Sequence, residues 1–335
     1  MKEAMLYEKM EGADVRCRLC AHRCRIKPGK RGTCGVRENR NGTLYSLVYG
    51  MVIAQNVDPI EKKPVFHLYP GSRSFSIATP GCNFCCSFCQ NHDISQMPRE
   101  TGRIVGRKTA PEEIVEQALK TGCRTIAYTY TEPTIYFEFA YDTARIAKEK
   151  GLKNVFVTNG FMTAEALETI APCLDAANTD LKAMSDDFYR KQCGARLQPV
   201  LDSLRRMKDL GIWVEVTTLL IPTLNDSDGE LRQIAEFIHG LGPETPWHIS
   251  RYHPQYKMTA PPPTPSAAIH RAARIGAESR LRYVYSGNIP GDEGEKTFCG
   301  NCGELLIDRY GFHIEAIHLK GTACPRCGTP LDGIL

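Results

Sequence analysis

Hydrophobic positions follow two different periods between residues 68 and 291 of this chain. Short apolar runs predict strands, and stretches with an apolar residue at every third or fourth position predict helices. The predicted strands are 72–79, 124–130, 154–158, 176–181, 213–220, 248–251 and 282–285. The predicted helices lie between them, at 109–119, 133–150, 163–173, 186–193, 197–209, 227–238 and 265–275.

Alternation of strands and helices predicts an α/β fold. Consecutive strands joined by helices form a parallel sheet with right-handed crossovers. About 220 residues is short for a full eight-fold barrel, whereas a partial (β/α)6 barrel fits this length. Functional side chains in such folds lie at the carboxyl ends of the strands.

The two ends of the chain depart from this rhythm. Residues 1–67 are predicted to form a cysteine-rich segment and a connector, because Asp58-Pro59 and Lys63-Pro64 interrupt the apolar pattern before residue 68. Residues 292–335 contain two alternating stretches around Tyr310-Gly311, which predict a hairpin. The expected domains are therefore 1–67, 68–291 and 292–335.

Composition limits the cellular compartments and the kinds of binding partner that we expect for this protein. The chain has 335 residues, 42% of them hydrophobic, and a net charge of +4, which is too small to require a nucleic acid or a membrane as partner. No run of about 18 apolar residues occurs, and the first residues do not resemble a signal peptide. Most of the 15 cysteines fall in three groups, which in a reducing compartment predict metal sites. We expect a cytoplasmic protein.

The central group is Cys82, Cys85, Cys86 and Cys89. Two adjacent Cys-x2-Cys pairs would suggest zinc, but zinc knuckles are usually separated by a loop of about ten or more residues. The alternative is Cys82-x3-Cys86-x2-Cys89, a loop that offers three thiolates to a four-iron cluster. Three protein ligands leave one iron open for chemistry, and we favour this interpretation.

The terminal groups each contain four cysteines. Cys17, Cys20, Cys24 and Cys34 surround turn-forming glycines and could hold structural zinc or a second iron–sulfur cluster. In the other group, Cys299-x2-Cys302 and Cys324-x2-Cys327 form two knuckles, each followed by glycine. This second spacing predicts a zinc ribbon, with rubredoxin-like iron as the alternative.

The motif Cys-x3-Cys-x-aromatic-Cys after a strand, with Phe88 as the aromatic residue, resembles the signature of radical S-adenosylmethionine (SAM) enzymes. The resemblance implies that Cys82, Cys86 and Cys89 hold a [4Fe-4S] cluster, with Cys85 turned away. It further implies that the cluster binds SAM and cleaves it reductively to a 5′-deoxyadenosyl radical, which abstracts hydrogen from a substrate. The continuation Gln90-Asn91 is similar to the branch that contains pyruvate formate-lyase activating enzyme.

Further short motifs at predicted strand ends resemble SAM contacts of that branch. Thr131-Glu132-Pro133 stands where relatives carry Gly-Gly-Glu-Pro, with Tyr130 and Thr131 in place of the glycines. By this resemblance the expected SAM-binding residues are Asn91, Thr131, Glu132, Thr158, Asn159, Asp180, Lys182 and His253. The alternatives are purely structural roles: Glu132 would cap the following helix, and Asp180 and Lys182 would form an ion pair at the rim of the barrel.

The order of a four-cysteine segment, a radical SAM barrel and a zinc ribbon resembles the radical SAM enzyme of the AmmeMemoRadiSam system. This implies an enzyme that acts on an unidentified small molecule or protein and receives electrons from a donor such as a ferredoxin or flavodoxin. One alternative is a glycyl-radical activase. A second is a non-catalytic metal scaffold or electron carrier, which would not need polar residues at several strand ends.

Overall fold

An eight-stranded sheet forms the centre of the molecule. The computed structural model describes residues 1–289 and 291–335. The strand order is β16-β15-β14-β13-β12-β11-β9-β8, with parallel neighbours from β9 to β16 and β8 antiparallel to β9. The strands are β8 (Ala54–Pro59), β9 (Arg73–Ala78), β11 (Thr125–Tyr128), β12 (Lys153–Thr158), β13 (Ala176–Asp180), β14 (Trp213–Leu220), β15 (Trp247–Arg251) and β16 (Val284–Gly287).

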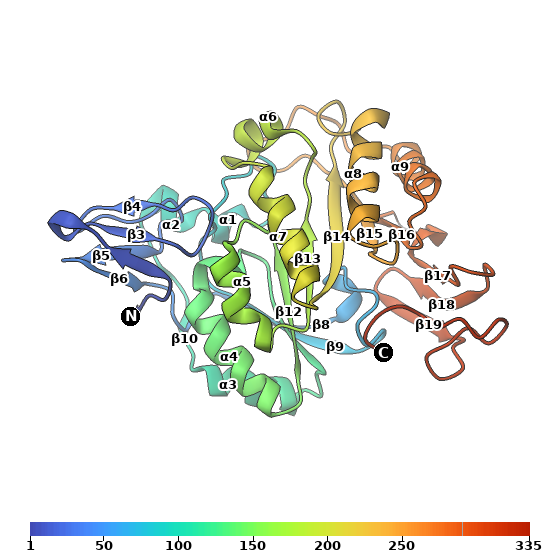
Figure 1. Ribbon diagram of the computed structural model, residues 1–335, viewed down its shortest axis with the longest axis horizontal. Helices are drawn as coiled ribbons and strands as arrows, with labels where there is room; N and C mark the ends of the chain where they lie inside the picture. Colours follow the sequence, from blue (N-terminus) through green and yellow to red (C-terminus); the bar gives the residue numbers. More distant parts are fainter. Residues whose placement is uncertain (290) are drawn as a thin grey trace.

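Helices that connect the parallel strands lie side by side along the sheet (Figure 1). The long ones are α3 (Pro111–Lys120), α4 (Phe137–Glu149), α5 (Ala164–Ile170), α7 (Gln198–Asp209), α8 (Asp228–Leu241) and α9 (Ser266–Glu278). Their apolar positions are buried because each helix has one apolar face, as with Ile114, Val115 and Ala118 of α3. Among the described residues, no helix combines the length and the apolar content needed to cross a membrane.

Local start signals explain where several of these helices begin. The hydroxyl of Thr163 accepts a hydrogen bond from the Ala166 N–H, and that of Ser227 accepts one from the Glu230 N–H. At α3 the residue before the helix is Ala110, whose N–H donates to the Glu113 carboxylate at 3.0 Å. These contacts satisfy N–H groups that have no partner within the first helical turn.

The predicted α/β partial barrel is confirmed, and all seven predicted strands occur in the parallel part of the sheet. Within the described residues the sheet stays open between β16 and β8. The predicted start of the barrel at residue 68 needs correction, because β8 (Ala54–Pro59) is already a strand of the same sheet. Its six residues pair with β9 as an antiparallel edge strand, a long-range pairing that the chain pattern did not indicate.

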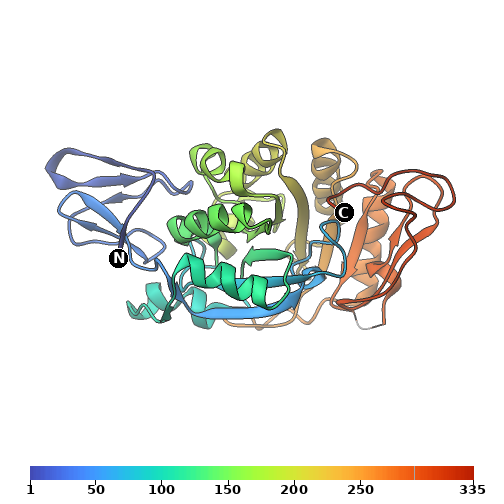
Figure 2. The same ribbon diagram turned by 90° about the horizontal axis from the view of Figure 1, so that it is seen from below.

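The N-terminal part consists of two small antiparallel sheets at one end of the long axis (Figures 1 and 2). One contains β1 (Lys2–Glu3), β6 (Thr43–Ser46) and β5 (Arg37–Arg40), and the other β2 (Tyr7–Lys9), β3 (Val15–Cys17) and β4 (Arg25–Ile26). A further short pair joins β7 (Met51–Val52) to β10 (Arg107–Lys108). The buried guanidinium of Arg37 binds the Glu138 carboxylate of α4 at 2.9 Å, which attaches this part to the barrel.

The C-terminal part lies at the opposite end of the long axis (Figure 1). Its sheet contains β17 (Thr297–Phe298), β18 (Leu305–Tyr310) and β19 (His313–Ile317), so the predicted hairpin around Gly311 is confirmed. The part is docked on the barrel, because buried Arg309 donates to the Phe66 carbonyl at 2.9 Å. The last residues return to the connector, where the Ile334 N–H donates to the His67 carbonyl at 2.8 Å.

Candidate functional site

A cavity of about 490 Å³ opens at the carboxyl ends of the parallel strands. Its volume lies within the range of small-ligand sites. Residues at the ends of β9, β11, β12 and β13 or just after them line its wall: Cys82, Cys86, Cys89, Asn91, Thr131, Glu132, Thr158, Asn159, Asp180 and Lys182. The topology therefore brings together every residue expected at the site except His253.

The four central cysteines are divided by the structure into three and one. Cys82, Cys86 and Cys89 line the cavity, whereas Cys85 is exposed and does not line it. The Cys85 thiol lies 3.6 Å from the carbonyl oxygen of Cys193, and the Cys85 N–H donates to the same oxygen at 2.9 Å. The arrangement agrees with the Cys-x3-Cys-x2-Cys interpretation.

A short π-helix, η5 (Tyr189–Cys193), supports the cysteine loop from outside. The Ser87 N–H donates to the Gln192 carbonyl at 2.9 Å, next to the bond between Cys85 and Cys193. Gly194 follows with φ of 67°, and a side-chain carbon added there would stand 2.4 Å from the Cys85 sulfur. Glycine at this position therefore makes the room into which Cys85 turns.

Burial and one nearby lysine set the charge of the cysteine loop. Burial raises the pKa of the Cys82 and Cys89 thiols, so each prefers its neutral form until a metal ion deprotonates it. Although burial alone lowers the pKa of Lys182, the Asp180 carboxylate 2.8 Å away and the nearby Cys86 raise it well above its ordinary value. A permanent positive charge next to three thiolates offsets part of their charge.

Glu132 joins the ends of two strands. Its carboxylate accepts hydrogen bonds from the Thr134 N–H at 3.0 Å, from the Thr158 hydroxyl at 2.7 Å and from the Asn159 N–H at 2.8 Å. The helix-cap alternative is thus part of its role, since the Thr134 N–H belongs to η3 (Pro133–Tyr136). Oxygen Oε2 accepts only the Asn159 bond among the described residues, which leaves acceptor capacity at the cavity wall.

The surroundings of Tyr130 explain how it can stand where the Gly-Gly-Glu-Pro pattern has glycine. Its backbone adopts φ of 61°, the left-handed region that normally favours glycine. The side chain compensates, because its hydroxyl donates to Asp58 at 2.6 Å and the Lys63 ammonium lies 4.5 Å from the ring centroid. Asp58 of strand β8 and Lys63, directly after η2 (Ile60–Lys62), therefore supply the partners that keep this turn in its glycine-like shape.

The remaining expected residues differ in how their polar groups are used. The Asn91 amide donates to the Tyr130 carbonyl at 2.7 Å, and the Thr131 hydroxyl donates to the Thr79 carbonyl at 2.8 Å. Asn159 donates to the Asn83 side chain at 2.8 Å. These three contacts hold the cysteine loop and the strand ends in one arrangement.

The structure does not bring His253 into the cavity. The side chain of His253 is exposed, beyond the end of β15. His248, inside β15, lines the cavity instead and binds the buried Glu215 carboxylate at 2.6 Å. The expectation for His253 therefore needs correction: this residue belongs to the exposed loop after β15, whereas the cavity is lined by residues inside the strand.

The cavity wall contains further residues that the sequence did not predict, and four of them carry acidic, imidazole or aromatic groups. Glu61 comes from η2 (Ile60–Lys62), His248 from β15, Glu295 from η6 (Glu293–Glu295) and Phe312 from the C-terminal hairpin. Three of them belong to segments outside the predicted barrel. No local pattern signals such residues, because they reach the cavity through the docking of the connector and the C-terminal part.

Glu295 should make stability depend on pH near neutrality. Burial raises the pKa of its carboxyl from 4.5 to about 7. The folded protein therefore holds a proton that the unfolded chain has released, and stability should fall by roughly 1 kcal/mol between pH 6 and pH 8. Thermal unfolding of wild type and Glu295→Gln at both pH values tests this. The variant should lose less stability over this interval, and equal losses would contradict the prediction.

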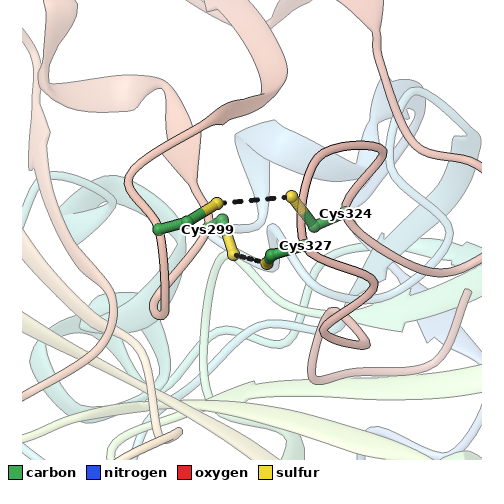
Figure 3. A group of neighbouring side chains, drawn as sticks. Cys299, Cys324 and Cys327 are labelled. Atoms are coloured by element: carbon green, nitrogen blue, oxygen red, sulfur yellow. Dashed lines mark hydrogen bonds between the residues drawn. The ribbon is translucent and has the colours of Figure 1, made fainter.

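The C-terminal cysteines form a compact group of four. The ligand atoms of Cys299, Cys302, Cys324 and Cys327 all lie within 4.8 Å of one another. Figure 3 shows the labelled side chains of Cys299, Cys324 and Cys327 turned toward one another from two loops. Gly303 and Gly328 adopt φ of 72° and 73°, as a tight turn after each cysteine pair requires. Four sulfur atoms at this spacing match a tetrahedral ion site.

Comparisons with known proteins agree with this geometry. The family model of the Radical SAM superfamily matches residues 76–238 of this chain. The uncharacterized protein MJ0808 of Methanocaldococcus jannaschii is 49% identical over 338 residues, which span all of both chains. The pyruvate formate-lyase-activating enzyme of Clostridium pasteurianum is 25% identical over 55% of this chain and 76% of its own.

Solved structures show the same fold. The structure of Streptococcus suis SuiB bound to S-adenosylmethionine superposes with a TM-score of 0.50 at 14% identity, over 62% of this chain and 48% of SuiB. The chain belongs to the radical SAM superfamily. That fold implies a [4Fe-4S] cluster and SAM, and three thiols on the wall of one cavity fit such a cluster.

Proposed function

We propose that this protein is a SAM-cleaving enzyme that starts a hydrogen abstraction on a small molecule or a protein. The observation that carries the proposal is the convergence of Cys82, Cys86 and Cys89 on a cavity from which Cys85 is excluded. When bound and reduced, the cluster supplies the electron that splits SAM into methionine and a 5′-deoxyadenosyl radical.

The residues of the chain would bind and orient the reactants. Glu132, with its unused acceptor capacity, and Thr131 would receive the ammonium group of SAM. Asn159 and Asp180 follow the next two strands and are proposed to face the rest of the cofactor, with Lys182 holding Asp180 by an ion pair. We propose that Glu61, Glu295 and Phe312, which also line the cavity, contact the substrate.

The proposal is tested by anaerobic reconstitution with iron and sulfide, followed by incubation with SAM and dithionite. We expect 5′-deoxyadenosine to form, and its absence from a preparation with a full iron complement would contradict SAM cleavage. A deuterium-labelled cell extract then identifies the substrate, because abstraction transfers deuterium into 5′-deoxyadenosine. A non-catalytic scaffold would give neither signal.

Within the superfamily, we propose membership of the AmmeMemoRadiSam radical SAM enzymes. In support, the chain carries four-cysteine groups on both sides of the barrel, and its activating-enzyme relative in Clostridium pasteurianum matches only 55% of it. We further propose a cytoplasmic location and a ferredoxin or flavodoxin as electron donor. Cell fractionation and reduction by each purified donor test these two points.

We propose zinc at the C-terminal cysteines. The Cys299 and Cys327 sulfur atoms are 3.6 Å apart, close to the separation of about 3.8 Å that follows from zinc–sulfur bonds of about 2.3 Å in a tetrahedron. Replacement of Cys302 by serine should reduce zinc from one equivalent to a small fraction and should raise amide exchange in β17, β18 and β19. Exchange in α4 is the internal control. Zinc binding that survives Cys302→Ser together with Cys299→Ser would contradict this assignment.

A further inference from the structure

The four N-terminal cysteines line a second, small cavity. Cys17 ends β3, Cys20 and Cys24 lie in the loop before β4, and Cys34 precedes β5. Cys17 and Cys34 are buried, and Cys20 and Cys24 are half-buried. The rest of the wall consists of residues from the N-terminal part and two from the barrel. The N-terminal ones are Leu19, Ile26, Gly32 and Arg37, and the barrel contributes Thr134 and Ile135. The arrangement is a small thiol site with two buried and two partly exposed cysteines.

Sulfur spacing separates this site from the C-terminal one. Among the described residues, the C-terminal quartet is the only group of three or more potential metal ligands whose atoms all lie within 4.8 Å. The N-terminal quartet is more widely spaced, and so is the cluster-binding triad Cys82, Cys86 and Cys89. A single zinc ion draws four sulfur atoms together, whereas an iron–sulfur cluster keeps them apart because each thiolate binds a different iron.

Arg37 adds a second observation that points to a bound ligand. Its side chain is 2% exposed, with Nη1 bound to Glu138 and Nη2 bound to the Met5 carbonyl. The buried Nε–H has no hydrogen-bond partner among the described residues, although Arg37 lines the cavity. An unsatisfied buried donor is costly, and the inorganic sulfides and thiolates of an iron–sulfur cluster bound in this cavity can accept its hydrogen bond.

The second cavity adjoins the central cysteine loop. A side-chain carbon added at Gly81 would stand 2.8 Å from Val36 and 3.5 Å from the Cys34 carbonyl. The Arg99 guanidinium donates to the Thr33 carbonyl at 2.9 Å and to the Cys82 carbonyl at 3.4 Å. One layer of backbone therefore separates Cys34 of the quartet from Cys82 of the triad.

We propose that Cys17, Cys20, Cys24 and Cys34 bind a second iron–sulfur cluster, which passes single electrons to the SAM-cleaving cluster. An external iron–sulfur or flavin donor would be oxidised by one electron and the N-terminal cluster reduced by one. That electron would then reduce the central cluster and regenerate the oxidised N-terminal one. The relay rests on the proposed SAM cleavage, whereas the presence of iron at the quartet does not.

The first test is the iron content of a full-length chain without the central ligands. A Cys82→Ala, Cys86→Ala, Cys89→Ala variant, reconstituted anaerobically, should retain about four iron and four sulfide per chain. On reduction it should give the electron paramagnetic resonance signal of a four-iron cluster. Absence of iron, with two zinc per chain, would overturn the proposal. This readout is independent of whether the wild type cleaves SAM.

A second variant, which keeps the central cysteines and lacks two of the N-terminal ones, tests whether the N-terminal cysteines bind iron. Cys20→Ser with Cys24→Ser should lower iron in the otherwise unchanged chain from about eight to about four. Cys173→Ala, at a buried cysteine outside the three groups, is the matched control and should keep about eight. Unchanged iron in the double variant would overturn the assignment of these ligands.

The relay is tested by the ratio of two rates of 5′-deoxyadenosine formation, one with a reduced ferredoxin and one with dithionite. Loss of the N-terminal cluster in Cys20→Ser, Cys24→Ser should lower this ratio at least tenfold relative to Cys173→Ala. An unchanged ratio would overturn the relay. If the wild type forms no product with either reductant, the proposed function fails, while the iron content still decides the second cluster.

Discussion

Replacing Cys86 by alanine should abolish 5′-deoxyadenosine formation, whereas the same replacement at Cys85 should leave most of it. Cys86 is buried at the cavity wall, and its loss removes one of three thiolates from the central cluster. Cys85 is exposed and turned toward the carbonyl of Cys193. Anaerobic assays of both variants with SAM and dithionite, together with their iron content, measure the effect.

Cys85→Ala is the matched control for Cys86→Ala. The two residues are neighbours in the chain, but the Cys86 thiol lines the cavity and the Cys85 thiol points to the Cys193 carbonyl. Cys85→Ala removes only a surface contact, so its effect on stability should stay within about 0.5 kcal/mol. Equal loss of activity in both variants would contradict the assignment of three ligands. It would favour the alternative in which two Cys-x2-Cys pairs share one ion.

The second large effect is expected for the buried ion pair between the N-terminal part and the barrel. Glu138→Gln should destabilise the protein by about 3–5 kcal/mol, because it leaves a charged guanidinium buried without its carboxylate. Arg37 and Glu138 are both nearly inaccessible to solvent, and the Glu138 charge helps to raise the pKa of Arg37 above its ordinary value, against the effect of burial. Urea unfolding under anaerobic conditions, followed by circular dichroism, measures the loss.

Asp187→Asn is the matched control for this charge removal. Asp187 pairs with Lys191 at 2.7 Å, but both side chains are about two-thirds exposed at 67% and 68%. An exposed pair contributes at most about 1 kcal/mol, so this variant should unfold close to the wild type. Similar unfolding midpoints for Glu138→Gln and Asp187→Asn would show that the buried pair does not hold the two parts together.

Local patterns predicted much of the fold. The strand and helix periods of 2 and 3.6 residues depend on near neighbours in the chain, so they gave all seven parallel strands. They did not indicate that β8 joins this sheet, since only the single turn of η2 lies between β8 and its antiparallel partner β9. The connector containing β8 also carries Asp58 and Lys63, which support Tyr130.

The motifs predicted which polar residues meet at the site, but they did not predict all the residues that form the cavity wall. Thr131, Glu132, Asn159 and Asp180 meet at one cavity because parallel strands end at the same edge of the sheet. His253 does not reach this cavity, and the neighbouring strand residue His248 does. Whether a histidine faces inward depends on the end of β15 and on strand orientation, which no motif records.

The sequence by itself determined the chemistry: three groups of cysteines, the radical SAM motif at Cys82, Cys86 and Cys89, and a parallel α/β barrel to present it. Only the tertiary structure decided how the groups differ and what else reaches the cavity. It placed the C-terminal sulfur atoms within 4.8 Å and brought Glu295 and Phe312 to the cavity wall. Ligand type follows from side-chain composition, whereas sulfur spacing and cavity walls depend on contacts between segments far apart in the chain.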